Sequence, residues 1–213
     1  MKNVVVVDYD CGNLFSVRRA FEHSGANVTF SSDGDEIAAA ERLVLPGVGA
    51  FGDAVASLNE LGLFDPIHDF AATGRPMLGV CVGMQLLFDS SDEFGDHAGL
   101  GLIPGTVSQI PKTRTDGEPH KIPHIGWNEL VAGEADNTWD GTLLESLRRS
   151  VYCYFVHSFR ATPADPAHQV ADCLYGGHRI AAMVGRDNVY GCQFHPEKSG
   201  PQGLEIIANF LAL

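Results

Sequence analysis

The sequence predicts an α/β fold: a single-domain three-layer sandwich in which a mostly parallel central sheet is flanked by helices. Continuous β-branched runs, such as residues 3–7, are typical of strands that are covered on both faces. Helix-like segments alternate with such runs through the first half of the chain, which indicates a parallel sheet. The 213 residues contain no internal repeat and no low-complexity linker, so we expect one domain over residues 1–213.

The first half supplies the alternating strands and helices. Strands are expected at residues 3–7, 27–30, 42–45 and 77–80. Helices are expected from Leu14 to a stop near Gly25, at residues 53–61 and at residues 65–73. Sites in open parallel sheets form at the carboxyl ends of the strands. Three loops leave such ends, at residues 8–13, 46–52 and 81–85.

The second half changes character after a polar loop at residues 89–100. Strands with short turns between them are expected at residues 106–110, 151–156, 169–174, 180–184 and 189–194. Proline, charge and histidine at residues 111–124 predict an exposed excursion, and the apolar spacing at residues 201–211 predicts a closing amphipathic helix.

Composition excludes several classes of function. The formal net charge of −13 argues against a surface for nucleic acid or for an anionic membrane. No apolar run is long enough to span a membrane, and the valine run at residues 4–7 is too short for a secretory signal. Five cysteines without a CxxC pair predict no disulfide framework and a reducing, cytoplasmic setting. No cluster has zinc spacing and Gly47-x-Gly49 lacks the third glycine of a dinucleotide loop, so we expect no metal and no cofactor.

Residues 77–88 read as a buried strand that turns sharply into a helix, with Cys81 at the turn. A nucleophile on such a turn presents its side chain at the strand tip, and Gly79 and Gly83 permit close packing on either side. The N-terminus of the following helix would favour the thiolate. An inert buried cysteine is the alternative reading of this stretch alone.

His195 and Glu197 lie two residues apart near the end of the chain. On an extended segment such residues face the same way, and Pro196 between them suits a strand end. The carboxylate would fix the orientation of the imidazole while the other ring nitrogen serves Cys81, which gives a cysteine triad. A surface pair is the alternative reading of the His-x-Glu motif alone. Cys11, Cys153, Cys173 and Cys192 are expected to be buried apolar fillers.

Residues 79–85 and 194–197 resemble the two signatures of class I, triad-type glutamine amidotransferases. The resemblance extends to the glutaminase subunit of imidazole glycerol phosphate synthase at residues 8–14, 46–51, 123–128, 154–159 and 195–199, and it spans essentially the whole chain. Two positions depart from the usual pattern: Asp10 stands where glycine is usual, and Val82 stands where leucine is usual.

The resemblance implies that the Cys81 thiolate attacks the side-chain carboxamide of L-glutamine, that His195 carries the proton to the leaving ammonia, and that Glu197 orients His195. Water then hydrolyses the γ-glutamyl thioester. The oxyanion needs two donors. The residues implied for the oxyanion are Val48, Gly49 and Val82, and those implied for glutamine binding are Gly47, Gly49, Gln85, Ser158 and Phe159. Gln85 as a helix surface residue and Phe159 as core packing are the alternatives.

The resemblance also implies a partner: a cyclase subunit with a (β/α)₈ barrel that forms a heterodimer with this chain and takes up the ammonia in L-histidine biosynthesis. The interface residues implied are Asn13, Lys121, His124, Trp127 and Tyr154, with Asn13 and Trp127 on loops that leave the nucleophile end of the sheet. The glutaminase of another amidotransferase and a non-catalytic regulatory binder remain as alternatives. The motif at residues 123–128 argues against the first, and the intact cysteine, histidine and glutamate set argues against the second.

Overall fold

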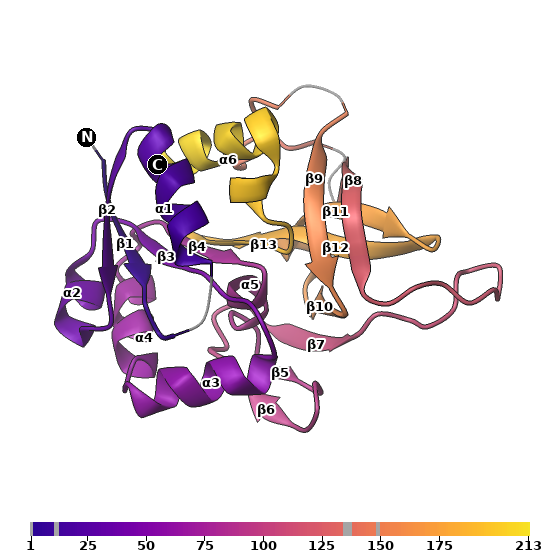
Figure 1. Ribbon diagram of the computed structural model, residues 1–213, viewed down its shortest axis with the longest axis horizontal. Helices are drawn as coiled ribbons and strands as arrows, with labels where there is room; N and C mark the ends of the chain where they lie inside the picture. Colours follow the sequence, from indigo (N-terminus) through magenta and orange to yellow (C-terminus); the bar gives the residue numbers. More distant parts are fainter. Residues whose placement is uncertain (1, 11–12, 134–137, 148–149) are drawn as a thin grey trace.

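The computed structural model describes residues 2–10, 13–133, 138–147 and 150–213 (Figure 1). Within this part of the chain a nine-stranded sheet has the order β2-β1-β3-β4-β13-β12-β11-β8-β9, and a four-stranded sheet has the order β10-β7-β5-β6. The large sheet runs through both halves of the sequence, because β13 from the C-terminal half pairs with β4 from the N-terminal half.

One half of the large sheet is parallel, as the alternation of strands and helices predicts. Its strands are β1 (Lys2–Val7), β2 (Ala26–Ser31), β3 (Leu43–Leu45), β4 (Met77–Val80) and β13 (Val189–Cys192). Leu43, Val44 and Leu45 are fully buried, which explains why β3 reads as a continuous apolar run.

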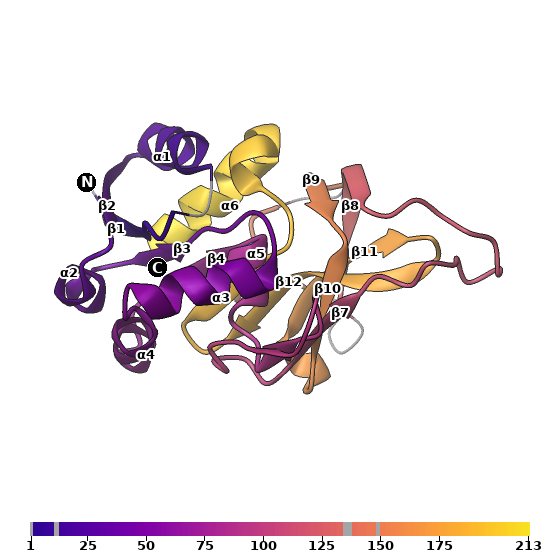
Figure 2. The same ribbon diagram turned by 60° about the horizontal axis from the view of Figure 1, so that its bottom comes forward.

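Helices cover both faces of this parallel half (Figure 2). One face carries α1 (Leu14–His23) and α6 (Gly200–Ala212), and the other carries α3 (Phe51–Glu60) and α4 (Phe64–Ala72), with α2 (Gly34–Ala39) beside α4. Phe21 of α1 meets Phe210 of α6 edge to face, with ring centroids 6.2 Å apart. The predicted three layers are therefore present.

The other half of the large sheet is antiparallel, so the sheet as a whole is mixed. Its strands are β12 (His178–Arg186), β11 (Gln169–Tyr175), β8 (His124–Ala132) and β9 (Tyr152–His157). Between β11 and β12, and between β12 and β13, the connection is too short for the long crossover that a parallel pair needs, so these pairs are antiparallel. The second sheet contains β10 (Phe159–Pro163), β7 (Gly105–Gln109), β5 (Ser90–Ser91) and β6 (His97–Ala98), and β10 contacts β12.

Several elements differ from the sequence predictions. The helix after Cys81 was expected to run on through the apolar residues to Phe88, but α5 spans only Val82–Gln85. It tightens because the N–H groups of Leu87 and Phe88 bond three residues back rather than four. The strands β8 and β10 and the helix α2 were not predicted, and the loop expected at residues 89–100 contains β5 and β6. Short 3₁₀ helices occur at Pro166–His168 (η1) and Pro196–Lys198 (η2).

In the part of the chain that the structure describes, no helix is long and apolar enough to cross a membrane. The same residues include no group of three or more His, Cys, Asp or Glu side chains arranged to hold a metal ion.

Candidate active site

Cys81 occupies a sharp turn between β4 and α5, with φ 57° and ψ −112°. A positive φ strains a residue with a side chain and persists only where the surroundings enforce it. Here the Cys81 N–H donates to the Cys192 carbonyl of the neighbouring strand at 2.8 Å. A Cβ added to Gly83 would lie 1.8 Å from the Leu45 carbonyl oxygen, and one added to Gly79 would lie 2.5 Å from the Gly83 oxygen. Because the two glycines have no side chains, the strand-to-helix turn at Cys81, called the nucleophile elbow below, packs directly against neighbouring backbone.

His195 and Glu197 form a buried pair beside this elbow. His195 Nδ1 lies 2.8 Å from Glu197 Oε1, and the two side chains are 3% and 2% exposed. The predicted pairing is present, but the predicted extended segment is not, because Pro196 begins η2 and Glu197 lies within that 3₁₀ turn. The turn, rather than a strand, folds the carboxylate back onto the imidazole.

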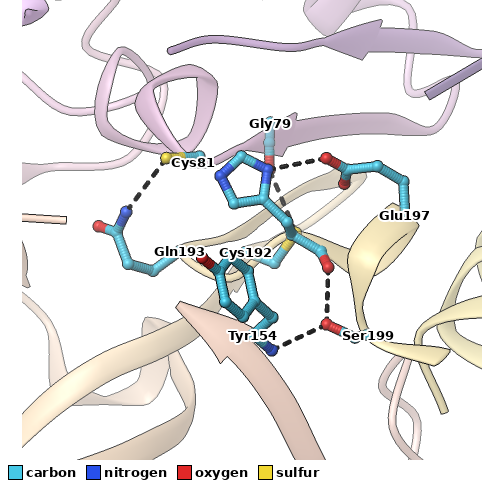
Figure 3. Close-up of polar contacts among 8 residues, drawn as sticks. Gly79, Cys81, Tyr154, Cys192, Gln193, Glu197 and Ser199 are labelled. Carbon is cyan, nitrogen blue, oxygen red and sulfur yellow. Dashed lines mark hydrogen bonds and ion pairs between the residues drawn. The ribbon is translucent and has the colours of Figure 1, made fainter. Parts of the chain in front are cut away.

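The backbone around the pair is fixed by a short chain of hydrogen bonds (Figure 3). The His195 N–H donates to the Tyr154 carbonyl at 2.9 Å. The Ser199 hydroxyl donates to the His195 carbonyl at 2.6 Å and accepts the Tyr154 N–H at 3.0 Å. These bonds tie the segment that carries the imidazole to β9.

The charge state of His195 follows from its neighbours. Burial lowers the pKa of His195, but Cys81 and Glu197 outweigh this effect and raise the pKa to about 9. Its Nε2 atom is buried and makes no hydrogen bond of normal geometry, which leaves that nitrogen available on the side of the ring away from Glu197. The imidazolium form is therefore favoured next to Cys81 at neutral pH.

A cavity of about 280 Å³ opens onto Cys81 and His195. It collects residues from the elbow, the loop after β3, the turn between β5 and β6, and the ends of β9 and β10. Its lining comprises Val48, Gly49, Cys81, Val82, Gln85, Glu93, Pro123, Val156, His157, Ser158, Phe159 and His195. Most of the residues that the resemblance implies for the oxyanion and for glutamine therefore border one space.

Gly47 does not line this cavity. It is buried, and an added Cβ would lie 2.7 Å from the Gly83 nitrogen and 2.9 Å from the Tyr9 hydroxyl oxygen. Gly47 therefore packs against the nucleophile turn, and its contact with substrate stays a prediction. Gly49 has φ 93°, which favours glycine, and it does face the cavity.

Gln85 is 3% exposed, which excludes the alternative of a helix surface residue. Its side-chain Nε2 donates to Gln193 Oε1 at 2.9 Å and to the Phe159 carbonyl at 3.3 Å. Phe159 is half-buried and its ring meets that of Phe94 at 6.4 Å. Gln85 therefore connects the nucleophile turn to the far wall of the cavity.

Three residues near the cavity were assigned no role from the sequence. Glu93 is 8% exposed and accepts the Phe51 N–H at 2.7 Å; burial raises the pKa of its carboxyl above the usual value. It lies in the loop expected to be merely polar, where no motif marks it. His157 lies inside the matching motif at residues 154–159 and Gln193 directly precedes the motif at residues 194–197, but the sequence does not reveal the contacts of either side chain.

His157 is joined to His124 by a hydrogen bond of 3.0 Å between Nε2 and Nδ1. The Phe159 carbonyl, 2.8 Å from His157 Nδ1, is only an acceptor, so His157 Nδ1 carries the proton and His124 Nδ1 must donate. Burial lowers the pKa of His157 to about 3 and that of His124 to about 4, so both rings are neutral at pH 7.

The residues implied for the partner interface are distributed unevenly. Trp127 is 56% exposed and lies opposite the half-buried Tyr154 on the β8–β9 ribbon, with ring centroids 6.2 Å apart. Trp127 belongs to a strand rather than to the predicted loop. Lys121 is exposed and Asn13, just before α1, is half-buried. His124 is corrected: it is 3% exposed because its ring stacks on Tyr175 at 4.1 Å, so it presents no surface to a partner.

The remaining cysteines divide into two groups. Cys153, Cys173 and Cys192 are buried, as predicted. Burial raises the pKa of Cys153 and of Cys173 to about 12, and raises that of Cys192 well above its usual value. Cys11 lies outside the described residues.

The family model for "Glutamine amidotransferase class-I" matches residues 5–213. The chain belongs to this family. The resemblance predicted from the cysteine and histidine motifs is thereby confirmed.

Relatives narrow the place of the chain within the amidotransferase family. Imidazole glycerol phosphate synthase subunit HisH 1 of Legionella pneumophila is 50% identical over 213 residues, which cover all of both chains. Imidazole glycerol phosphate synthase subunit HisH of Geobacillus thermodenitrificans is 43% identical, over all of this chain and 97% of the relative. The solved structure of PurLQS from Thermotoga maritima superposes with a TM-score of 0.75 at 21% identity, over 99% of this chain and 98% of that one, which supports the fold alone.

Proposed function

We propose that this chain, as one domain over residues 1–213, is the glutaminase subunit of imidazole glycerol phosphate synthase. In this role it hydrolyses L-glutamine to L-glutamate and ammonia. The observation that carries the proposal is the meeting of Cys81 with the buried His195–Glu197 pair at one cavity, in a chain 43–50% identical to relatives of that name.

The chemistry follows from these three side chains. The Cys81 thiolate attacks the carboxamide carbon, and His195 gives its proton to the amide nitrogen as ammonia leaves. A water molecule, deprotonated by His195, then attacks the thioester carbon and releases glutamate with the regenerated thiolate. Glu197 holds Nδ1 at 2.8 Å throughout, so the imidazole keeps its orientation in both steps.

The oxyanion of each tetrahedral intermediate requires donors near Cys81. Val82 borders the cavity directly after the nucleophile, and its backbone N–H is the first donor. The second comes from the Val48–Gly49 peptide, where Gly49 at φ 93° leaves the backbone room to rotate. We propose that the isolated chain holds this peptide in an inactive orientation and that the partner shifts it.

Recognition of the α-ammonium group of glutamine is assigned to Glu93. This carboxylate is largely buried at the cavity wall, and one oxygen is already engaged by the Phe51 N–H. The second oxygen suits a substrate cation, because an opposite charge offsets the burial that raises the pKa of Glu93. Ser158 and Phe159 border the same space and complete the pocket.

The partner is proposed to be the (β/α)₈-barrel cyclase subunit, bound as a heterodimer in the cytoplasm. The exposed apolar residues Ile125, Trp127 and Tyr152 lie on the β8–β9 ribbon beside the cavity and support a docking surface there. Delivery into a partner keeps ammonia from the protonation that would remove its nucleophilic lone pair in bulk water.

The test is the glutaminase rate of the purified chain alone, with the cyclase subunit, and with cyclase plus its nucleotide ligand. We expect slow hydrolysis by the chain alone and a rate at least tenfold higher in the liganded complex. Glutamine-dependent activity with an anthranilate or vitamin B6 synthase, but not with the cyclase, would assign the chain to another amidotransferase. Glutamine binding without turnover in every mixture would support a regulatory binder. If the isolated chain hydrolyses glutamine as fast as the liganded complex, the proposed reorientation of the Val48–Gly49 peptide by the partner is wrong. The glutaminase assignment would not be affected.

A further inference from the structure

Gln193 places a hydrogen-bond donor against the proposed nucleophile. Its side chain is 0% exposed, and its Nε2 atom lies 3.8 Å from Cys81 Sγ, within hydrogen-bond range for sulfur. Figure 3 shows the amide of Gln193 and the carboxylate of Glu197 on opposite sides of the site around Cys81. Of these two groups, the Gln193 amide contacts the sulfur, whereas the Glu197 carboxylate bonds His195.

The orientation of this amide is fixed by a second buried amide. Gln193 Oε1 accepts a proton from Gln85 Nε2 at 2.9 Å. Gln85 in turn has its other Nε2 proton directed at the Phe159 carbonyl, 3.3 Å away, which is only an acceptor. Gln85 must therefore present nitrogen to Gln193, and Gln193 must present nitrogen to the sulfur.

A thiolate at this position needs such a donor. Cys81 is 4% exposed, so water solvates the sulfur poorly, and burial of a charge without partners is costly. His195 contributes positive charge on the side of Cys81, which raises the pKa of the imidazole, and Gln193 adds a donor that does not titrate. An amide N–H stabilises the anion without titrating itself, and a hydrogen bond to a charged acceptor is stronger than one to a neutral thiol.

We propose that Gln193 is a catalytic hydrogen-bond donor to the Cys81 thiolate and that Gln85 locks it in the donating orientation. The proposal rests on the nucleophile role of Cys81. It adds a neutral donor beside the imidazolium at the two stages where the sulfur is a thiolate, before attack on glutamine and on release from the thioester.

The test is the pH dependence of iodoacetamide alkylation at Cys81, followed by peptide mass spectrometry so that each cysteine is counted separately. Gln193→Met keeps the length of the side chain and removes the donor. We expect its alkylation midpoint to rise by about one pH unit, with a roughly tenfold lower rate below the midpoint. Gln193→Glu, which faces the thiolate with a negative charge, should raise the midpoint further.

Asn188→Ala is the matched control. Asn188 precedes the same strand β13 at its opposite end, and its side-chain amide donates to the Ala71 and Arg75 carbonyls at 3.1 and 2.7 Å. Its loss should lower the melting temperature without moving the Cys81 midpoint. A folded Gln193→Met chain with an unchanged midpoint would overturn the proposal and leave Gln193 a buried spacer.

A second measurement uses the unsubstituted side chain, so it holds even where both Gln193 variants fail to fold. The NMR signals of the Gln193 amide protons should move as Cys81 titrates, and Cys81→Ala should abolish that movement. Gln193 amide signals whose chemical shifts do not change as Cys81 titrates would overturn the donor assignment. An ordinary thiol profile for Cys81 in the unsubstituted chain would instead refute the activated nucleophile on which the proposed function depends.

Discussion

The nucleophile elbow and the β8–β9 ribbon border the same cavity but are held in different ways. The elbow is held by backbone: Cys81 donates to the Cys192 carbonyl, and Gly83 passes against Leu45. The ribbon has its own antiparallel backbone ladder, and side chains reinforce its attachment, because the His124 ring stacks on Tyr175 at 4.1 Å and on Phe155 at 5.0 Å. A backbone contact leaves no room for a Cβ, whereas stacked rings can adjust. We therefore expect a substitution that adds one carbon atom at the elbow to lower the free energy of unfolding sharply. A substitution on the ribbon should have a smaller effect.

The largest effect is expected at the sulfur itself. Cys81→Ala should lower glutaminase activity of the complex by roughly a thousandfold or more, because no other group can form the thioester. The melting temperature should remain within a few degrees, since alanine fits the same turn. An alkylating glutamine analogue should label Cys81 alone among the described cysteines; equal labelling of Cys192 would contradict a specially activated thiolate.

Gly83→Ala tests the backbone-held side of the comparison. The new Cβ would lie 1.8 Å from the Leu45 carbonyl oxygen, so α5 must move away from the end of β3. We expect a loss of about 3 kcal/mol or more in the free energy of unfolding, measured by urea denaturation. Gly74→Ala is the control: unlike Gly83, it has a positive φ, at 77°, but its Cβ meets nothing within 4 Å, so only the backbone strain of about 1 kcal/mol is expected. Equal losses in the two variants would show that crowding at the elbow is unimportant.

Glu197→Gln separates orientation from proton transfer. The amide can still accept from His195 Nδ1 but cannot stabilise the imidazolium, so a roughly 10–100-fold fall in kcat is expected. His195→Ala should abolish turnover in the same assay. Full activity of Glu197→Gln would reduce the triad to a dyad of Cys81 and His195.

Trp127→Ala addresses the ribbon and carries the smallest expected effect. With 56% of the side chain exposed, its removal should cost little stability and shift the melting temperature by no more than a few degrees. Affinity for the cyclase, measured by titration calorimetry, should fall about tenfold. Leu61, 44% exposed at the end of α3, provides the control through Leu61→Ala, for which association should not change. A large stability loss with normal association would place Trp127 in the core.

Features with local sequence signals could be predicted, whereas features formed by residues far apart in the chain could not. The parallel strands, the elbow and the His195–Glu197 pair depend on apolar runs, glycines and short spacing, all of which are local signals. Glu93 could not be found in this way, because its hydrogen bond to Phe51 joins residues 42 positions apart. The burial of His124 arises from rings on two other strands, Phe155 and His157 of β9 and Tyr175 of β11, and the spacing of residues in the sequence does not predict such stacking. The short length of α5 could not be predicted either, because the carbonyls of Leu86 and Phe88 beyond its end accept from Leu100 and Gly101, more than ten residues away.

The pairing of β4 with β13 has a consequence for how this protein can vary. Cys81 follows β4 directly, His195 follows β13 closely, and the two strands are hydrogen-bonded neighbours with Gly191 opposite Gly79. The separation between nucleophile and base is thus set by the interstrand spacing of about 4.8 Å rather than by the hundred or so residues between them. Insertions and deletions in the intervening loops leave that separation intact. Docking surfaces and pocket walls on those loops are therefore free to diversify while the reaction chemistry stays the same.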